Sequence, residues 1–470
     1  TLRAASGSFD ASLVSAINNI QMTGAGTLSG MTAAQAANVQ IRADGAYGVA
    51  LNVATGTADV VSIALGTGTT TAATVNISTG LTANGFETIN LTTNAGSTST
   101  SGANQISTIA AFTADKVTAI NLNGTSFNIT NVATTKAVTI DGSKLTGDGS
   151  ATPVGLVTAG DAASGSTVIG SDHADTFTIT AEGQTYNAGA GNDTFVISSA
   201  DPEALTAADG STDLVLDGGA STTGDILKYL STSATDATAL TDVAFNNVSN
   251  MEKLTLSNTG NLSLTTGGNF NAAFSSGVTI TTGALAEASD VTIAAGLSTV
   301  DMTITIDAKL IDGAGAAEDT TITTGSGDDK VTFDGDATYV SSTTGGTVTI
   351  DTNAGDDTIV VNAGTLTADA ANQAFSIDGG AGRDTITLTK INSDEGSDVD
   401  MLGNAKIIVT SGESTISAYD TVKGIDLGAT DYSGSTDAIA DNVDFEGSDV
   451  VSDFTNSTNF GTVASHTISN

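Results

Sequence analysis

The feature that most constrains this chain is a short turn sequence, rich in glycine and ending in aspartate, which recurs between residues 188 and 386. Glycine lets the backbone turn tightly through positive φ angles. A large apolar residue stands two positions after each aspartate, where it can start a buried strand. Such regular punctuation predicts short strands joined by tight turns and stacked as repeats. The segments that share the pattern are 188–195, 324–331, 352–359 and 379–386.

These segments differ in how completely they match. The segment 379–386 matches G-G-x-G-x-D-x-U in full, where U is a large apolar residue, whereas the others lack the first glycine and 352–359 has Asn353 for the second. Weaker versions lie at 170–177, at 218–227 with two additional residues, and at 312–319. For Asp225 and Asp319, whose turns carry insertions, two interpretations stay open: a cation ligand or a residue of an ordinary turn.

The spacing of glycines and aspartate suits calcium. Calcium is a hard cation that takes six to eight oxygen ligands at about 2.3–2.6 Å. One turn offers about half of such a shell from carbonyl and carboxylate oxygens, and a stacked neighbour offers the rest. The alternative is that these are tight turns without a metal. The candidate metal-binding residues are Gly170, Asp172, Asp175, Gly189, Gly191, Asp193, Gly218, Asp225, Asp312, Asp319, Gly325, Gly327, Asp329, Asn353, Gly355, Asp357, Gly379, Gly380, Gly382 and Asp384.

Charge narrows the range of partners. The chain has 52 acidic against 13 basic residues, which gives a formal net charge of −39. Phosphate binding needs a basic face, so nucleic acid is excluded as a partner, and an anionic membrane surface would repel the chain. No apolar run of about 18 residues is present, so membrane insertion is not expected. Cation binding is the interpretation that best explains acidic residues concentrated in glycine-rich turns.

Catalytic signatures are missing from the sequence. Cysteine is absent, which excludes disulfides and thiol chemistry. His173 and His466 are the only histidines, too few for a zinc cluster. Neither H-E-x-x-H nor G-x-S-x-G occurs, so metalloprotease and lipase activities find no support. We therefore expect that the chain is not an enzyme.

Most of the sequence predicts short strands. Strands are predicted at 49–53, 60–65 and 74–78. A phrase at 85–92 is repeated at 117–123 and 248–256, and alternation places Phe86, Ile89 and Leu91 in the core. Helical character is confined to 11–20 and 32–39, where Thr32 can cap the second stretch.

The aspartate-containing turns resemble the calcium-binding nonapeptides of the RTX (repeats-in-toxin) family. Their dispersed placement, the repeated phrase between them and the cysteine-free composition resemble RTX-type surface-layer (S-layer) proteins of Gram-negative bacteria. The resemblance implies type I secretion, calcium as cofactor, and an extracellular lattice of identical subunits anchored to cell-surface polysaccharide. Spacing departs from a regular β-roll, because Asp175 and Asp193 are 18 residues apart whereas 28 and 27 residues separate Asp329, Asp357 and Asp384.

The sequence thus predicts an all-β fold with parallel β-solenoid or β-roll segments and a small helical element at the N-terminus. The expected function is a calcium-dependent, self-assembling S-layer subunit. The alternative is a secreted RTX-type adhesin, or an extracellular matrix or filament protein, that binds a surface glycan. The expected regions are a partly helical element at 1–45, β-repeats at 46–160, a calcium-binding solenoid at 161–400 and a β region at 401–470.

Overall fold

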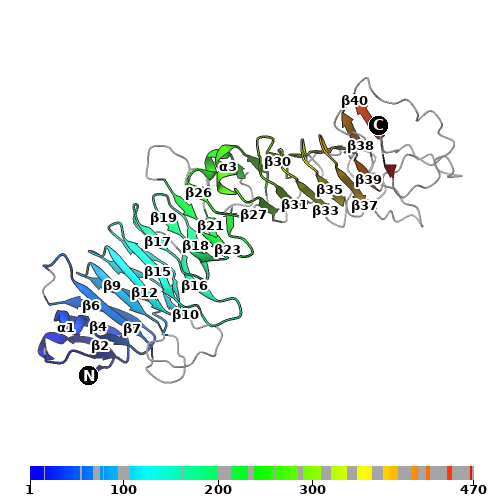
Figure 1. Cartoon of the computed structure of the whole chain (residues 1–470). Helices are drawn as coiled ribbons and strands as arrows, with labels where there is room; N and C mark the ends of the chain where they lie inside the picture. Colours follow the sequence, from blue (N-terminus) through cyan, green and yellow to red (C-terminus); the bar gives the residue numbers. More distant parts are fainter. Residues whose placement is uncertain are drawn as a thin grey trace. The chain divides into compact units, whose positions relative to one another are not determined.

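The structure, a computed structural model, is built almost entirely of short strands that wind in successive coils (Figure 1). Contacts divide the chain into two compact units. Unit 1 comprises Thr1–Ser199, Ala204–Lys228 and Asn246–Met251, and unit 2 comprises Ala200–Glu203, Tyr229–Phe245 and Glu252–Asn470. The structure describes residues 1–14, 16–52, 55–66, 75–77, 79–93, 106–159, 162–198, 213–230, 238–257, 260–283, 289–308, 319–335, 347–362, 374–389, 404–410, 420–423, 442–446 and 466–467.

In the described part of unit 1, parallel strands form three sheets and a short extra pair. The first sheet has the order β1 (Leu2–Ala4), β3 (Ile20–Met22), β5 (Val39–Ile41), β7 (Val60–Leu65), β9 (Thr88–Thr92), β12 (Ala119–Gly124), β15 (Thr139–Leu145), β17 (Thr167–Ile169), β19 (Thr185–Asn187), β22 (Val215–Asp217) and β26 (Val248–Ser249). The second has the order β14 (Val132–Thr134), β11 (Phe112–Ala114), β8 (Gly80–Asn84), β6 (Ala46–Leu51), β4 (Gly26–Met31) and β2 (Gly7–Asp10). The third contains β10 (Ile106–Ile109), β13 (Ser126–Ile129), β16 (Val154–Ala159), β18 (Ala174–Ile179), β21 (Thr194–Ser198) and β24 (Ile226–Leu230), and the pair is β20 (Ala190–Gly191) with β23 (Ala220–Ser221).

Unit 2 repeats this architecture with two sheets of described strands. One sheet has the order β25 (Thr238–Leu240), β28 (Leu262–Thr265), β30 (Val291–Ala294), β32 (Thr320–Thr323), β34 (Thr347–Asp351), β36 (Ala374–Asp378), β38 (Asn404–Thr410) and β40 (Asn442–Glu446). The other contains β27 (Lys253–Ser257), β29 (Val278–Thr282), β31 (Met302–Ala308), β33 (Lys330–Gly335), β35 (Thr358–Asn362), β37 (Thr385–Thr389), β39 (Thr421–Lys423) and β41 (His466–Thr467). β39 and β41 pair antiparallel, whereas the strands before them pair parallel.

Strand alternation and exact register explain how the core forms. In β9 every second residue is buried, and Ile89 and Leu91 pair with Ile120 and Leu122 of β12. Phe86, Ile89 and Leu91 are fully buried, as predicted. Because successive side chains point to opposite faces, the repeated phrase stacks like on like and fills a thin core with aliphatic side chains. The predicted all-β fold with parallel β-solenoid segments is confirmed.

Helices are few and short. Thr32 caps α1 (Ala33–Ala36) through a capping box with Gln35, as its sequence suggests. Within 11–20, only the 3₁₀ helix η1 (Ala11–Val14) is helical among the described residues. Unit 2 adds a second 3₁₀ helix, η2 (Asp242–Phe245), and α3 (Gly268–Ala273). No helix in the described ranges has the length and apolarity needed to cross a membrane.

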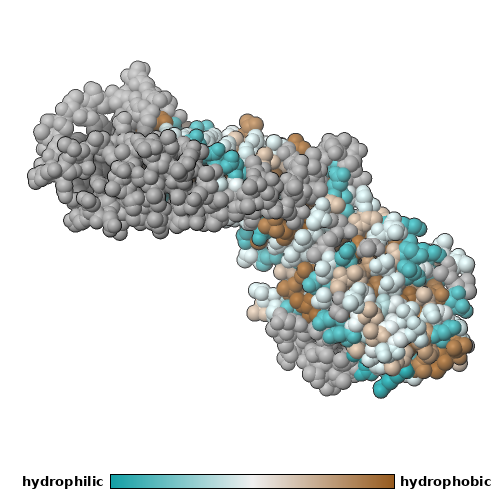
Figure 2. All heavy atoms as spheres, turned by 180° about the vertical axis from the view of Figure 1, so that it is seen from behind, coloured by the Kyte–Doolittle hydropathy of each residue, from teal (hydrophilic) through white to brown (hydrophobic). Residues whose placement is uncertain are grey.

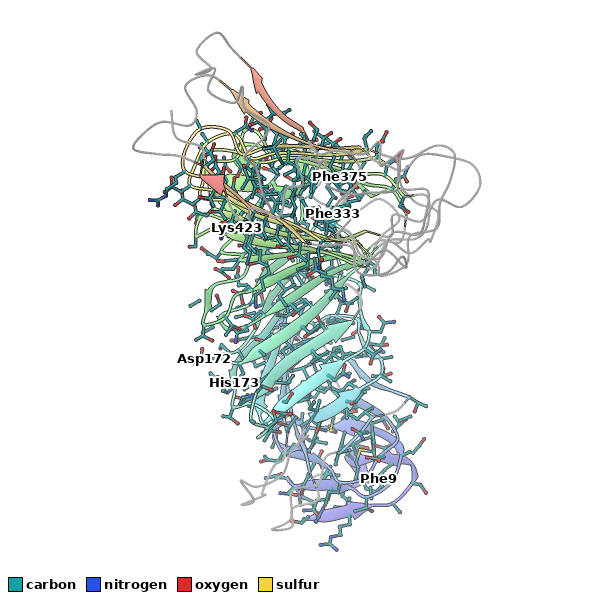
Figure 3. All side chains as sticks on the ribbon, turned by 90° about the vertical axis from the view of Figure 1, so that its right-hand side faces the viewer. Phe9, Asp172, His173, Phe333, Phe375 and Lys423 are labelled. Atoms are coloured by element: carbon teal, nitrogen blue, oxygen red, sulfur yellow. The ribbon has the colours of Figure 1, made fainter. Side chains whose placement is uncertain are left out.

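Buried aromatic side chains occur in both units, and those of unit 2 form one cluster and one separate pair. Phe245 of η2 packs edge-on against Phe270 of α3 with ring centroids 5.0 Å apart, and Phe274 and Tyr229 complete the cluster. Further along, Phe333 and Phe375 lie between the two sheets with centroids 6.4 Å apart (Figure 3). On the coloured atoms of Figure 2, hydrophobic residues form small groups among hydrophilic and intermediate ones.

Candidate metal centre

The aspartate-containing turns lie where the chain passes from one sheet to the next. In unit 2 they connect β32 to β33, β34 to β35, and β36 to β37. In unit 1 they connect β17 to β18 and β19 to β21. We number the six residues of each turn one to six, so that position six is the aspartate before the strand. The six-residue turns are 170–175, 188–193, 324–329, 352–357 and 379–384.

Glycines allow these turns to stack in direct contact. Gly380 has a φ angle of +74°, which favours glycine. A β-carbon at Gly380 would overlap the carbonyl oxygen of Asn353, and one at Gly382 would overlap that of Gly355. The turns are also hydrogen-bonded to each other, since the N–H of Gly355 donates to the carbonyl of Ala381 at 3.0 Å. The glycine pattern is therefore a requirement of coil stacking.

Stacking aligns the position-six aspartates, which we call the inner aspartates, into a ladder. In unit 2 the N–H groups of Met302, Asp329 and Asp357 donate to Oδ1 of the inner aspartate of the following coil at 2.8, 2.7 and 2.9 Å. Asp384 N–H donates in the same way to Asp420 at 3.0 Å. Each carboxylate thus caps the backbone where the preceding coil enters its strand.

Unit 1 has a ladder of the same kind. Asp175 N–H donates to Asp193 Oδ1 at 2.7 Å, and Asp193 N–H donates to Asp225 Oδ1 at 2.7 Å. Leu156 N–H donates to Asp175 Oδ1. Asp225 therefore occupies the inner column even though its turn is two residues longer than the six-residue turns.

The second carboxylate oxygen of most inner aspartates is left without a hydrogen-bond partner. This holds for Oδ2 of Asp193, Asp329, Asp357 and Asp384, whose side chains are at most 2 % exposed. An ionised carboxylate that is buried and incompletely hydrogen-bonded is costly. Burial accordingly raises the pKa of Asp193 and Asp384 to about 8 and of Asp357 to about 7, and it raises the pKa of Asp329.

The carboxylate of Asp175 has a different set of hydrogen-bond partners. The N–H of Ser171 donates to its Oδ2 at 2.6 Å, and the Ser171 hydroxyl lies 3.1 Å from both carboxylate oxygens. Burial still raises the pKa of Asp175, to about 6. Both oxygens of this carboxylate therefore have protein partners. Asp172, at position three of the same turn, is exposed at the edge of the ribbon beside His173 (Figure 3).

A second, exposed ladder runs along position five in unit 2. Asp328 N–H donates to Asp301 at 2.9 Å, Asp356 N–H donates to Asp328 at 2.9 Å, and Arg383 N–H donates to Asp356 at 3.1 Å. Arg383 also forms an ion pair with Asp356 at 2.9 Å. Solvent screens these exposed carboxylates, so a negative charge on this outer ladder costs less free energy than one on the inner ladder.

The donor chemistry of the inner column fits a hard cation. The available donors are buried carboxylate oxygens with no hydrogen-bond partner and backbone carbonyls, and calcium prefers such oxygen donors. No cluster of three or more His, Cys, Asp or Glu side chains that could hold a metal ion is found in the described ranges. A bound cation would thus take one carboxylate oxygen per turn and the remaining ligands from carbonyls or water.

The structure locates most of the other predicted site residues. The glycines predicted as site residues lie in the stacked turns, and a β-carbon on Gly189, Gly325 or Gly355 would overlap a carbonyl oxygen of the preceding turn. Asp319 lies outside the inner column: its Oδ1 accepts the N–H of Thr347 at 2.9 Å at the start of a strand. Asp312 lies outside the described residues.

Sequence reasoning missed several residues that act in these turns. Asp420 continues the inner ladder without a glycine turn before it, and Asp301 begins the outer one. The signal that points to Asp420 is the strand entry Asp-Thr-apolar, which it shares with Asp193, Asp357 and Asp384. The hydroxyls of Thr324 and Thr352 were also overlooked.

Fold and site together define a parallel β-solenoid with columns of buried aspartates along its turns. No family model, curated protein or solved structure matches this chain.

Proposed function

We propose that the chain is a structural subunit of a calcium-dependent, self-assembling extracellular surface layer and has no catalytic role. The observation that carries this proposal is the inner column, in which buried carboxylate oxygens of Asp193, Asp329, Asp357 and Asp384 lack a hydrogen-bond partner. A column of this kind costs free energy unless protons or cations neutralise it. Extracellular calcium is a cation suited to all-oxygen sites.

Calcium would couple folding to the environment outside the cell. Each inner aspartate belongs to one coil and caps the preceding coil, so a cation at its free oxygen would tie successive coils together. The ligands do not form such a set in the unfolded chain, and the binding free energy therefore adds to the free energy of unfolding. The cation would neutralise the charge of the inner column, and the aspartates and glycines would hold the cation in a fixed position.

Assembly follows from the same electrostatics. Chains that each carry a formal net charge of −39 repel one another, and this repulsion opposes a dense lattice. Divalent cations reduce that repulsion. The proposed partners are further copies of this chain and, from the resemblance to RTX-type S-layer proteins, a cell-surface polysaccharide.

The test is a calcium titration into the EDTA-treated chain, followed by circular dichroism and light scattering. We expect an increase in β signal and then large, ordered particles that electron microscopy resolves as sheets. Folding without assembly would favour the adhesin alternative. The variant carrying both Asp193→Asn and Asp384→Asn should need more calcium for both steps, whereas Asp328→Asn in the exposed ladder should behave as the wild type. An unchanged signal across the titration would refute the calcium proposal.

A further inference from the structure

Two of the chain's three arginines lie together on the outer face of a sheet in unit 1. Arg3 belongs to β1 and Arg42 directly follows β5, and Gln21 of β3 lies between them. Arg3 Nε and Arg42 Nη1 both donate to Oε1 of Gln21 at 3.2 Å. The two guanidinium groups are therefore held beside one acceptor, although their positive charges repel each other.

Hydrogen bonds between side-chain amides fix this arrangement. Nε2 of Gln21 donates to Oε1 of Gln40 at 2.9 Å, and Nε2 of Gln40 donates to the carbonyl of Gly66 at 3.2 Å. Because its amide nitrogen is engaged with Gln40, Gln21 presents its oxygen to the two arginines. The guanidinium pair is thus in position before any partner binds, which lowers the entropy cost of binding.

The positive charge of the pair is not neutralised within the described part of the chain. Neither arginine forms an ion pair with a described carboxylate. Asp44, two residues after Arg42, instead accepts the backbone N–H of Asn76 at 2.7 Å. A guanidinium carries several N–H donors, and each of the two uses one here, so most remain available. Planar donors of this kind bind carboxylates through two parallel hydrogen bonds.

Unit 2 carries a matching pair of exposed carboxylates. Asp290 and Asp319 directly precede β30 and β32, which are neighbouring strands and so about 4.7–4.9 Å apart. Oδ1 of Asp290 accepts the N–H of Asp319 at 2.9 Å, and Oδ1 of Asp319 accepts the N–H of Thr347 at 2.9 Å. Among the described residues, no donor binds Oδ2 of either aspartate. Backbone contacts therefore hold two carboxylates side by side, each with one oxygen left for a partner.

The outer ladder shows how an arginine binds a carboxylate held in this way. Oδ1 of Asp356 accepts the backbone N–H of Arg383, and its Oδ2 accepts Nη2 of the same residue at 2.9 Å. The outer ladder thus already contains an arginine of its own chain. No described lysine or arginine pairs with Asp290 or Asp319. Their Oδ2 atoms are available for the contact that Arg383 makes with Asp356.

We propose that the Arg3–Arg42 pair of one copy binds the Asp290–Asp319 pair of a second copy. This inference rests on the proposed self-assembly. Charge complementarity selects the occupant, because copies with a formal net charge of −39 repel one another and a guanidinium pair without a counter-charge attracts a carboxylate pair. The two surfaces differ, so the contact is heterologous. A heterologous contact that does not close into a ring propagates as an open array, as a surface layer requires.

Charge reversal in the calcium-saturated full chain tests this contact. The variants Arg3→Glu/Arg42→Glu and Asp290→Lys/Asp319→Lys should each need at least about tenfold more protein to assemble, measured by light scattering. An equimolar mixture of the two should assemble again, since each variant supplies the charges that the other now lacks. Circular dichroism checks that each variant folds. If a charge-reversed chain does not fold, Arg3→Gln/Arg42→Gln removes only the positive charges and should also weaken assembly.

The matched control reverses two other cations of unit 1. Lys136 and Lys144 are exposed, and Lys136→Glu/Lys144→Glu changes the net charge by the same amount as the arginine variant. This control should assemble at the wild-type concentration. Equal weakening in the control and in the arginine variant would mean that net charge, and not this contact, governs assembly, and it would overturn the inference.

The outcomes separate this inference from the proposed function. Assembly of the arginine variant at the wild-type concentration overturns the inference and leaves calcium-dependent assembly standing. Weakened assembly that the mixture does not restore shows that the arginines bind something other than Asp290 and Asp319, which overturns the assignment. An arginine variant that assembles normally but no longer binds cell-surface polysaccharide would make a glycan the occupant. A wild type that folds with calcium but never assembles overturns both proposals.

Discussion

Oδ1 of Asp384 accepts the backbone N–H of Asp357 at 2.9 Å, although 27 residues separate them in the sequence. The other oxygen of Asp384 is buried and has no hydrogen-bond partner. One carboxylate therefore does two things: it fixes the register of two coils, and it places a negative charge where water cannot reach it. The stability of this contact depends on what neutralises the charge.

Asp384→Asn separates these two roles. The amide keeps an acceptor for Asp357 and removes the buried charge. In EDTA we expect the variant to unfold at a higher urea concentration than the wild type, because burying the carboxylate is costly. In calcium the order reverses, since the wild type gains about 2.7 kcal/mol when free calcium is 100 times its dissociation constant. Urea denaturation under both conditions measures this reversal.

Asp328→Asn is the matched control for that variant. Asp328 also accepts the N–H of the next coil, from Asp356 at 2.9 Å, but it is exposed. Its urea midpoint should equal that of the wild type in EDTA and in calcium, because solvent screens the charge. A midpoint for Asp384→Asn that also equals the wild type under both conditions would contradict the buried-charge argument.

The sequence allowed the fold and most of the inner column to be predicted, because both depend on local patterns. Alternation identified Ile89 and Leu91 as core residues, and the glycine spacing identified Asp357 and Asp384. Asp420 was not predicted because no glycine-rich turn precedes it. Only the pairing of β37 with β39 places it next to Asp384. The carbonyl that Thr352 binds lies one coil away and depends on register, which the pattern does not specify.

Acidity should stabilise the metal-free chain. Burial raises the pKa of Asp193 and Asp384 to about 8 from the ordinary aspartate value of 3.8. Between these values the folded chain holds protons that the unfolded chain has lost, so the free energy of unfolding decreases as pH increases. The contribution is complete below about pH 4 and is lost as pH rises through about 8. Urea midpoints in EDTA at about pH 5 and about pH 8 measure the decrease.

The variant with both Asp193→Asn and Asp384→Asn provides the comparison. General repulsion among exposed acidic groups also weakens the fold as pH increases, and this variant retains nearly all of it. Its midpoint should therefore decrease less between the two pH values than that of the wild type. Equal decreases in the two proteins would show that these two aspartates do not cause the loss of stability with increasing pH.

Gly380→Ala should weaken the turn that carries Asp384. The residue has a φ angle of +74°, and a β-carbon there would overlap the carbonyl oxygen of Asn353. Strain in the left-handed region alone costs about 1 kcal/mol, and the overlap adds to this. Gly268→Ala at the start of α3 meets nothing within 4 Å and is the control. Thermal unfolding should show a lower midpoint for Gly380→Ala than for Gly268→Ala; the reverse order would contradict direct stacking of the turns.

Phe245→Ala tests the aromatic cluster of unit 2 apart from any metal. Phe245 is 1 % exposed and packs against Tyr229, Phe270 and Phe274, so truncation leaves a cavity and should cost about 3–5 kcal/mol. Val243 of the same 3₁₀ helix is 41 % exposed, and Val243→Ala should change stability by less than about 0.5 kcal/mol. Urea denaturation in saturating calcium compares the two. If the cluster stabilises unit 2 independently of the inner aspartates, Phe245→Ala will lose the same free energy of unfolding in EDTA. A loss seen only with calcium would mean that the cluster and the cation site unfold in the same cooperative step.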